Sequence, residues 1–246
     1  LGRDAVIANP AIPFEHPLLV AAAERGIPVT TEINIVLARC RAPVYAVTGT
    51  KGKSTTSTLL ARMLEAYGFH VHLGGNVGRA LVARLDAIEP EHRVVLELSS
   101  FQLHHAHALG RSPHVSIVTN LLSDHLDRHG TQDAYAEAKR AALAYQHADD
   151  VAVLPADDEA VRAAGWLESG RARRVLYGDG GRFRLDGEQV HCAETGRTAH
   201  LAGLTLLGAH NRRNALTAAA AILGTLEDGF DAVANGARRT EALPHR

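Results

Sequence analysis

The sequence predicts an α/β protein built on a mostly parallel, doubly wound sheet with a smaller antiparallel β portion. From Pro43 onward, short apolar runs rich in β-branched residues alternate with segments of helical pattern, as in sheets whose parallel strands are joined by helices. Residues 44–60 read as a buried strand, a glycine-containing loop and a helix. Between residues 178 and 206, short alternating runs and paired glycines predict antiparallel strands.

Residues 1–41 form a shorter stretch of α/β pattern before this unit. They contain two short strands and two helices, which cannot bury enough apolar surface to fold alone. We therefore expect them to be the last part of a Rossmann-like domain, and residues 42–246 to form a second, central domain. The expected strands are 5–8, 28–31, 44–47, 70–73, 93–98, 114–119, 151–154 and 174–177. The expected helices are 16–25, one ending near 40, one from the glycine loop to 67, one after 78 ending at 85, one starting near 99, and those at 131–147, 157–167, 211–226 and 228–238.

The composition is that of an ordinary globular chain. Of its 246 residues, 46% are hydrophobic and 22% are charged, which argues against disorder. The net charge of −1 leaves no basic field for nucleic acid or an anionic membrane. No apolar stretch is long enough to span a membrane, no signal peptide is recognisable, and Cys40 and Cys192 match no metal spacing. We expect a cytoplasmic monomer with two isolated buried thiols.

The segment TGTKGKST at residues 48–55 carries the strongest chemical signal. A glycine loop between a strand and a helix directs backbone N–H groups and the positive end of the helix dipole at one spot, where phosphate binds. The common P-loop spacing would place Gly where this chain has Val47. Lys53 is expected to neutralise the outer phosphates and Ser54 to ligate Mg²⁺; helix N-capping is the other role open to Ser54 and Thr55. The loop residues expected to bind nucleotide are Gly49, Thr50, Lys51, Gly52, Lys53, Ser54 and Thr55.

A single acid ends an otherwise apolar strand in VVLELSS. Glu97 lies where the carboxyl ends of parallel strands meet, beside the phosphate loop. A carboxylate there suits Mg²⁺, held directly or through water. The alternative is a strand-end acid paired with an arginine, and we favour the metal role.

The polar loop at residues 119–129 concentrates aspartate and histidine, in DHLDRH, after a strand. This combination suits a metal site or a proton transfer. A solvated loop has the same composition, so the residues alone leave these alternatives open. His104, His105 and His107 form another cluster on a helix, and we expect them to lie at the surface.

Lysine is rare in this chain. Only three of the 26 basic residues are lysines, and two of them lie in the phosphate loop. Lys139 is the third and lies on the helix after the polar loop, where this rarity argues mildly against an exposed lysine paired with its neighbours. Asn211 and Asn214 share a face at the start of a long helix and suit a nucleotide's polar edge; capping by Asn211 alone is the alternative.

These motifs occur together in the order seen in the Mur ligases, the ATP-dependent amide ligases of peptidoglycan precursor synthesis. The chain resembles this family over residues 5–246, through TGTKGKST, GGNVG, LELSSFQL, DHLDRHG, YAEAKR, LLGAHNRRNAL and the final LPHR. Within the family, LELSSFQL and LPHR most resemble the ligases that add D-glutamate.

The resemblance implies a reaction in two steps. ATP would phosphorylate the carboxylate of UDP-N-acetylmuramoyl-L-alanine, and the amine of D-glutamate would attack the acyl phosphate to give amide and phosphate. The first step brings two anions together, which only cations can stabilise.

The resemblance also implies which residues act. The residues implied to contact the nucleotide are those of the phosphate loop, Asn211, Asn214 and Arg246. Those implied to contact the UDP-sugar substrate are Asn76, Gln102 and His125. Those implied to hold two Mg²⁺ ions are Ser54, Glu97, His125 and Lys139, the last as a carbamate. Those implied in catalysis are Lys53, His125 and Lys139.

Two features depart from the family pattern. Lys51 stands where the family usually has Asn, which adds a cation beside the phosphates. The resemblance covers the end of the family's UDP-binding domain, over 1–41, and its central ATP-binding domain, over 42–246, and none of the third domain. We therefore expect this polypeptide to bind nucleotide weakly, if at all, and not to ligate. The competing functions are another Mur-type or folylpolyglutamate-type ligase, and a P-loop nucleotide-binding module without ligase chemistry.

Overall fold

The centre of the molecule is a nine-stranded sheet with the strand order β11-β10-β9-β8-β7-β6-β3-β5-β4. The computed structural model describes residues 4–78, 80–201, 204 and 208–240. Neighbouring strands from β4 to β9 run parallel, and β9, β10 and β11 pair antiparallel. The strands are β3 (Val44–Thr48), β4 (Val71–Gly75), β5 (Arg93–Glu97), β6 (Val115–Val118), β7 (Val151–Pro155), β8 (Arg173–Tyr177), β9 (Phe183–Asp186), β10 (Gln189–Cys192) and β11 (Thr198–His200). The predicted fold class is confirmed.

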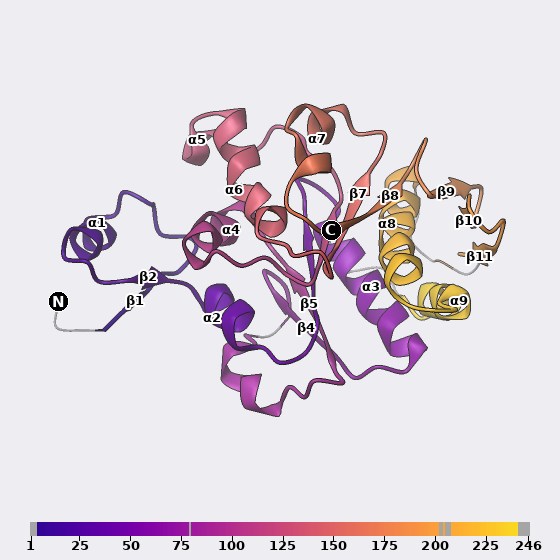
Figure 1. The fold of residues 1–246 in the computed structure, drawn as a ribbon, viewed down its shortest axis with the longest axis horizontal. Helices are drawn as coiled ribbons and strands as arrows, with labels where there is room; N and C mark the ends of the chain where they lie inside the picture. The colour runs from indigo at the N-terminus through magenta and orange to yellow at the C-terminus, as the bar shows by residue number, and fades with distance from the viewer. Residues whose placement is uncertain (1–3, 79, 202–203, 205–207, 241–246) are drawn as a thin grey trace.

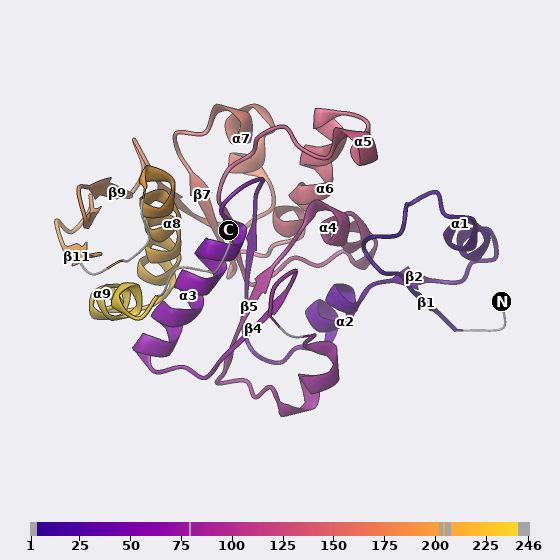
Figure 2. The ribbon, with the colours of Figure 1, turned by 180° about the vertical axis from the view of Figure 1, so that it is seen from behind.

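Helices cover both faces of this sheet (Figures 1 and 2). Alternate residues of β3 point to opposite faces, because side chains alternate along a strand. Tyr45 and Val47 belong to a core with α3, α8 and α9, whereas Val44 and Ala46 belong to a core with α2, α4 and α6. The helices are α1 (Pro17–Glu24), α2 (Glu32–Arg39), α3 (Lys53–Tyr67), α4 (Ser100–Ala106), α5 (Leu126–His129), α6 (Gln132–Ala144), α7 (Glu159–Ala163), α8 (Ala209–Thr225) and α9 (Phe230–Arg238), with 3₁₀ helices η1 (Val82–Ala87), η2 (His107–Leu109) and η3 (Trp166–Glu168).

The strand order reverses at β3. The chain places β4 and β5 on one side of β3 and β6 on the other, so helices α3 and α4 lead away from neighbouring strands toward opposite faces. At such a switch point the carboxyl ends of the strands leave a crevice that binds ligands. The fold therefore brings the phosphate loop after β3, the end of β5 and the polar loop after β6 to the same edge.

Helix α9 lies unusually close to α3. A Cβ placed on Gly236 would lie 2.5 Å from the Met63 Cα atom, which is closer than the neighbouring backbone allows. The small residue lets the two helices approach, and the contact ties the end of the described chain to the helix that follows the phosphate loop.

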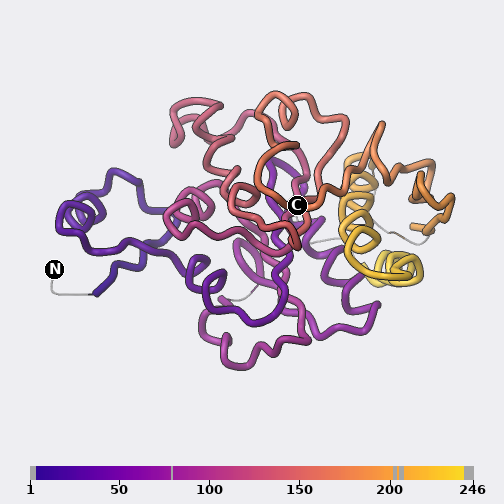
Figure 3. The backbone as a smooth tube through the Cα atoms, viewed as in Figure 1, coloured from indigo at the N-terminus to yellow at the C-terminus, as the bar shows by residue number. Residues whose placement is uncertain are grey.

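The N-terminal segment projects from one end of the molecule (Figures 1 and 3). There β1 (Val6–Ile7) and β2 (Val29–Thr30) form a separate two-stranded parallel sheet. Helix α2 instead packs Ile33 and Val36 into the core beneath β3, so the last part of this segment is anchored to the nine-stranded sheet.

Two local predictions are wrong. The helix expected to end at residue 85 is the 3₁₀ helix η1, which ends where the backbone of Ile88 becomes extended. Cys192 is buried as expected, but Cys40 is only partly buried. Among the described residues, no helix combines the length and the apolar composition that crossing a membrane requires.

Candidate nucleotide-binding site

The phosphate loop joins β3 to α3 in a conformation that requires glycine. Gly49 and Gly52 have φ values of 140° and 83°, a region that L-residues rarely adopt. A Cβ at Gly49 would overlap the Thr119 hydroxyl, and one at Gly52 would overlap the Asn214 amide. Gly52 is also the N-cap of α3, so neither Ser54 nor Thr55 occupies the capping position. The start of this helix is thus built as an anion site.

Two lysines converge on one carbonyl oxygen of this loop. The Lys53 Nζ donates to the Gly49 oxygen at 3.1 Å and to the Thr50 oxygen at 3.0 Å. The Lys139 Nζ donates to the same Gly49 oxygen at 2.9 Å. The Lys53 ammonium supplies positive charge at the edge of the loop where a triphosphate would need it.

Lys139 is one of the largest fully buried side chains, with 1% of its surface exposed. Burial, and secondarily the charge of Lys53, lowers the pKa of Lys139 to about 7. Glu97 and Asp124 act in the opposite direction. The reading of Lys139 as an exposed helix lysine is therefore wrong, and a substantial fraction of its amine is neutral near neutral pH.

Tyr135 connects Lys139 to the phosphate loop. Its hydroxyl donates to the Thr50 Oγ1 at 3.1 Å, and the Lys139 Nζ lies 4.8 Å from the centre of its ring. The Thr50 hydroxyl in turn donates to the Leu122 oxygen at 3.0 Å. Sequence reasoning missed Tyr135, although it precedes Lys139 by four residues on the same helix and so shares its face.

Glu97 is buried at the carboxyl end of β5 with one oxygen unsatisfied. Its side chain is 1% exposed, and its Oε1 accepts a hydrogen bond from the Asn76 Nδ2 at 2.9 Å. Among the described residues, the Glu97 Oε2 has no hydrogen-bond partner. A buried carboxylate oxygen without a partner is costly, and a cation would satisfy it. The residues present thus fit a Mg²⁺ ion at this position better than a paired strand-end acid.

His125 lies at the rim of the same site. It has a positive φ of 51° and is the N-cap of α5. Its ring lies 6.4 Å from that of Tyr135 and 5.0 Å from that of Phe101. About half of its side chain is exposed, and its Nε2 lies 3.9 Å from the Asp124 Oδ2. Tyr135 therefore contacts both His125 and Lys139, and the polar loop borders the phosphate loop.

Lys51 differs from the other two lysines. Its side chain is 72% exposed and its Nζ lies 3.7 Å from the Asp124 Oδ2. Its backbone is fixed by Asn120, whose Oδ1 accepts from the Lys51 N–H at 3.0 Å, and by Thr119, whose hydroxyl donates to the Lys51 oxygen at 2.7 Å. The backbone of Lys51 shapes the loop while its charge is largely in solvent.

The two asparagines at the start of α8 face the phosphate loop. The Asn214 Nδ2 donates to the Asn211 Oδ1 at 3.3 Å, which confirms the expected shared face, and the Asn214 side chain lies against Gly52. The N-cap of this helix is Gly208, so Asn211 does not cap it. Arg246 lies outside the described residues.

Gln102 has a structural partner within its own helix. Its Oε1 accepts from the Ser99 N–H at 2.9 Å, and its N–H donates to the Ser99 Oγ at 3.3 Å, which together form a capping box. Gln102 is 7% exposed. Next to it, the His129 Nε2 lies 2.9 Å from the Ser100 Oγ, which joins α4 to the polar loop.

The histidines of α4 and η2 are not a simple surface cluster. His105 and His107 are half-buried, and His104 stacks on Phe14 with ring centres 3.8 Å apart. Burial, together with neighbouring histidines, lowers the pKa of His104 to about 4. The expected surface placement holds for His104, which is exposed, and fails for His105 and His107, which are partly buried. The chain near Phe14 packs against this helix, a contact that sequence separation hides.

The chain is similar to known proteins over nearly its whole length. A family model described as the Mur ligase middle domain matches residues 47–222. The UDP-N-acetylmuramoylalanine–D-glutamate ligase of Symbiobacterium thermophilum is 42% identical over 228 residues, which is 89% of this chain and 49% of the relative. The same-named enzyme of Trichlorobacter lovleyi is 37% identical over 99% of this chain and 55% of its own length.

Solved structures show the same fold at lower identity. A UDP-N-acetylmuramoyl-L-alanyl-D-glutamate–2,6-diaminopimelate ligase matches with a TM-score of 0.70 at 18% identity, over 99% of this chain and 64% of its own. The MurF ligase of Thermotoga maritima, solved in complex with ADP, matches with a TM-score of 0.61 at 20% identity, over 92% of this chain and 60% of its own. The chain spans about half the length of the curated relatives it matches. Through its middle domain and these relatives, the chain belongs to the Mur ligase family.

Proposed function

We propose that this chain carries the ATP-binding centre of a ligase that adds D-glutamate to UDP-N-acetylmuramoyl-L-alanine through an acyl phosphate. One observation carries the proposal: Lys53 and the buried Lys139 donate to the same oxygen of a glycine loop at the switch point of the sheet. The names of the relatives that are 33–42% identical support D-glutamate as the amine substrate. We also propose that the protein is a cytoplasmic monomer.

The phosphates of ATP would lie across the start of α3. The backbone N–H groups of the first turn and the Lys53 ammonium would hold their oxygens, and Ser54 and Thr55 lie in that turn. Asn214 with Asn211 borders the loop from α8 and would contact the nucleotide, together with Arg246.

Ser54 and Glu97 would hold one Mg²⁺ ion, and His125 with Lys139 a second. The unsatisfied Oε2 of Glu97 is the observation that fits the first ion. Bound Mg²⁺ would supply the charge that lets a phosphate and a carboxylate approach each other. Asn76 holds the second oxygen of Glu97 and so fixes the direction in which the carboxylate presents Oε2.

Lys139 suits conversion to a carbamate. Its neutral amine can attack CO₂, which forms an N–C bond, and the nitrogen then releases one proton. The product is an anion beside the Lys53 ammonium, so the two side chains at the Gly49 oxygen would attract each other. Burial of the side chain excludes water from the group.

The UDP-sugar would enter beside α4 and the polar loop. Asn76, Gln102 and His125 would contact it there, and the hydrogen bond between His129 and Ser100 joins the polar loop to α4. We propose that ligation belongs to a protein of the relatives' length, and that the 246-residue chain alone binds nucleotide weakly and does not ligate.

Phosphate release measured on two proteins tests the proposal. A full-length ligase that contains this chain is expected to release phosphate only when ATP, UDP-N-acetylmuramoyl-L-alanine and D-glutamate are all present. The 246-residue chain is expected to release none under the same conditions. Equal release with L-alanine or diaminopimelate in place of D-glutamate would favour another Mur-type ligase, and release by the short chain would overturn its predicted inactivity.

A further inference from the structure

Three histidines meet at the opposite end of the sheet from the phosphate loop. His70 directly precedes β4, His72 lies within it, and His92 directly precedes β5. The parallel register pairs Val71 with Arg93, so His70 and His92 lie side by side at the start of the two strands. His72 is two residues beyond His70 and therefore shares its face.

The three rings lie close together, and those of His70 and His72 are stacked with planes 17° apart. One ring nitrogen from each histidine lies within 4.8 Å of the other two. The ring centres are 4.7 Å apart for His70 and His72, 4.4 Å for His70 and His92, and 5.1 Å for His72 and His92. The His72 Nε2 and the His92 Nδ1 are already only 3.0 Å apart.

These separations suit one metal ion. Two imidazole nitrogens bound to a tetrahedral Zn²⁺ ion at about 2.0–2.1 Å lie roughly 3.4 Å apart. The His72–His92 pair thus has close to the required spacing, whereas the His70 ring, which stacks on that of His72, would have to turn to present a nitrogen to the same ion. The His92 Nδ1 also accepts a hydrogen bond from the Glu89 N–H at 3.2 Å. An ion between His72 and His92 would replace this bond and the proton that the two rings share, and the His72 proton would move to its Nδ1.

We propose that His70, His72 and His92 form a binding site for a late first-row divalent metal ion of the Zn²⁺ class, with water as the fourth ligand. An all-imidazole donor set favours Zn²⁺, Ni²⁺, Cu²⁺ and Co²⁺ over Mg²⁺ and Ca²⁺, which prefer oxygen ligands. The site is therefore chemically distinct from the magnesium positions proposed beside the phosphate loop.

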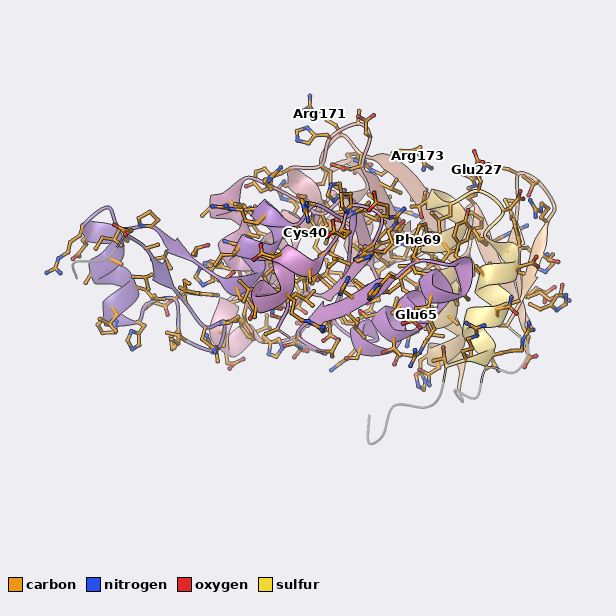
Figure 4. All side chains as sticks on the ribbon, turned by 90° about the horizontal axis from the view of Figure 1, so that it is seen from below. Cys40, Glu65, Phe69, Arg171, Arg173 and Glu227 are labelled. Carbon is orange, nitrogen blue, oxygen red and sulfur yellow. The ribbon has the colours of Figure 1, made fainter. Side chains whose placement is uncertain are left out.

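The position of the three histidines would give such an ion a structural role. β4 is the edge strand of the sheet and pairs only with β5 in the described sheet. An ion held by both strands would fix their amino ends, while Asn76 and Glu97 are joined at their carboxyl ends. Figure 4 shows the molecule from below with Phe69, the residue before His70, labelled. The Arg93 guanidinium lies 3.8 Å from the centre of the Phe69 ring.

Zinc binding to the untagged 246-residue chain tests the proposal. In excess Mg²⁺, equilibrium dialysis is expected to show one Zn²⁺ bound per chain, and Co²⁺ in its place should give the visible absorption of a four-coordinate site. His72→Asn is expected to weaken Zn²⁺ binding by more than the roughly 10–100-fold that loss of an outer-shell partner costs, because it removes a direct ligand.

Two further variants make the result decisive. His70→Asn changes an exposed ligand and should weaken binding without loss of the folded circular dichroism signal, whereas His200→Asn, an exposed histidine on β11, should bind as the parent does. Zn²⁺ should raise the unfolding temperature of the parent and of His200→Asn only. If the folded parent binds no Zn²⁺, the three rings merely stack and share a proton. If binding persists in both ligand variants, the ion lies elsewhere; either result overturns the proposal.

Discussion

At the scale of single residues, Lys139 decides how the site is interpreted. A lysine that is 1% exposed and bonded to the Gly49 oxygen is not a solvating charge. Its lowered pKa means that the folded protein binds fewer protons at this residue than the unfolded chain does between about pH 7 and the ordinary lysine range. The free energy of unfolding must therefore rise with pH across that interval.

The change Lys139→Met tests this titration. The variant lacks the buried amine, so the unfolding free energy of the parent relative to the variant should increase from pH 6 to pH 9, by an amount on the order of a few kcal/mol. Urea unfolding at several pH values measures it. Lys51→Met, at an exposed lysine, should show no such trend, and a pH-independent difference for Lys139→Met would contradict a depressed pKa.

Tyr135 offers a second test at this scale. Tyr135→Phe removes the hydroxyl that donates to Thr50 and should lower the free energy of unfolding by roughly 0.5–1.5 kcal/mol. Tyr67→Phe is the matched control, because its hydroxyl donates to the Glu227 oxygen at the surface and its removal should cost less. Equal losses of unfolding free energy in the two variants would show that the buried hydrogen bond to the phosphate loop stabilises the fold no more than the surface one.

At the scale of elements, the glycines set the distances between helices and loops. Gly236 brings α9 against the Met63 backbone on α3, the helix that follows the phosphate loop. Replacing a glycine within a helix by alanine usually stabilises the protein, by roughly 0.5–1 kcal/mol. Here the added methyl group has no room, so the packing cost outweighs the helix gain.

Gly236→Ala should therefore destabilise the protein. The two helices must move apart, at a net cost of roughly 1–3 kcal/mol typical of overpacked cores. Thermal unfolding measures the loss, with Arg239→Ala, an exposed position just after α9, as the control. An unfolding temperature at or above that of the parent would show that α9 adjusts freely and does not constrain α3.

At the scale of the whole molecule, the sequence predicts the sheet well and the site only in part. Strands β3, β6 and β7 are short and mostly apolar, and the glycine loop marks the switch point. What no pattern supplies is contact across the chain: Lys139 reaches Gly49 over 90 residues, and His70 meets His92 only because β4 and β5 pair in one register. The roles of Asn76, Gln102 and His125 toward substrate remain predictions. The prediction of an α-helix at η1 is wrong because apolar spacing does not distinguish a 3₁₀ helix from an α-helix.

The central claim is that Lys139 acts in a ligase and does not merely support a nucleotide-binding loop. The decisive measurement is D-glutamate-dependent phosphate release by a full-length ligase containing this chain, with and without Lys139→Ala. Lys139→Ala is expected to lose at least about tenfold in activity, since a group that organises a metal is removed, and to recover part of it when bicarbonate or short carboxylic acids are added. Full activity in Lys139→Ala would contradict the account and leave a nucleotide-binding module whose buried lysine has a structural role alone.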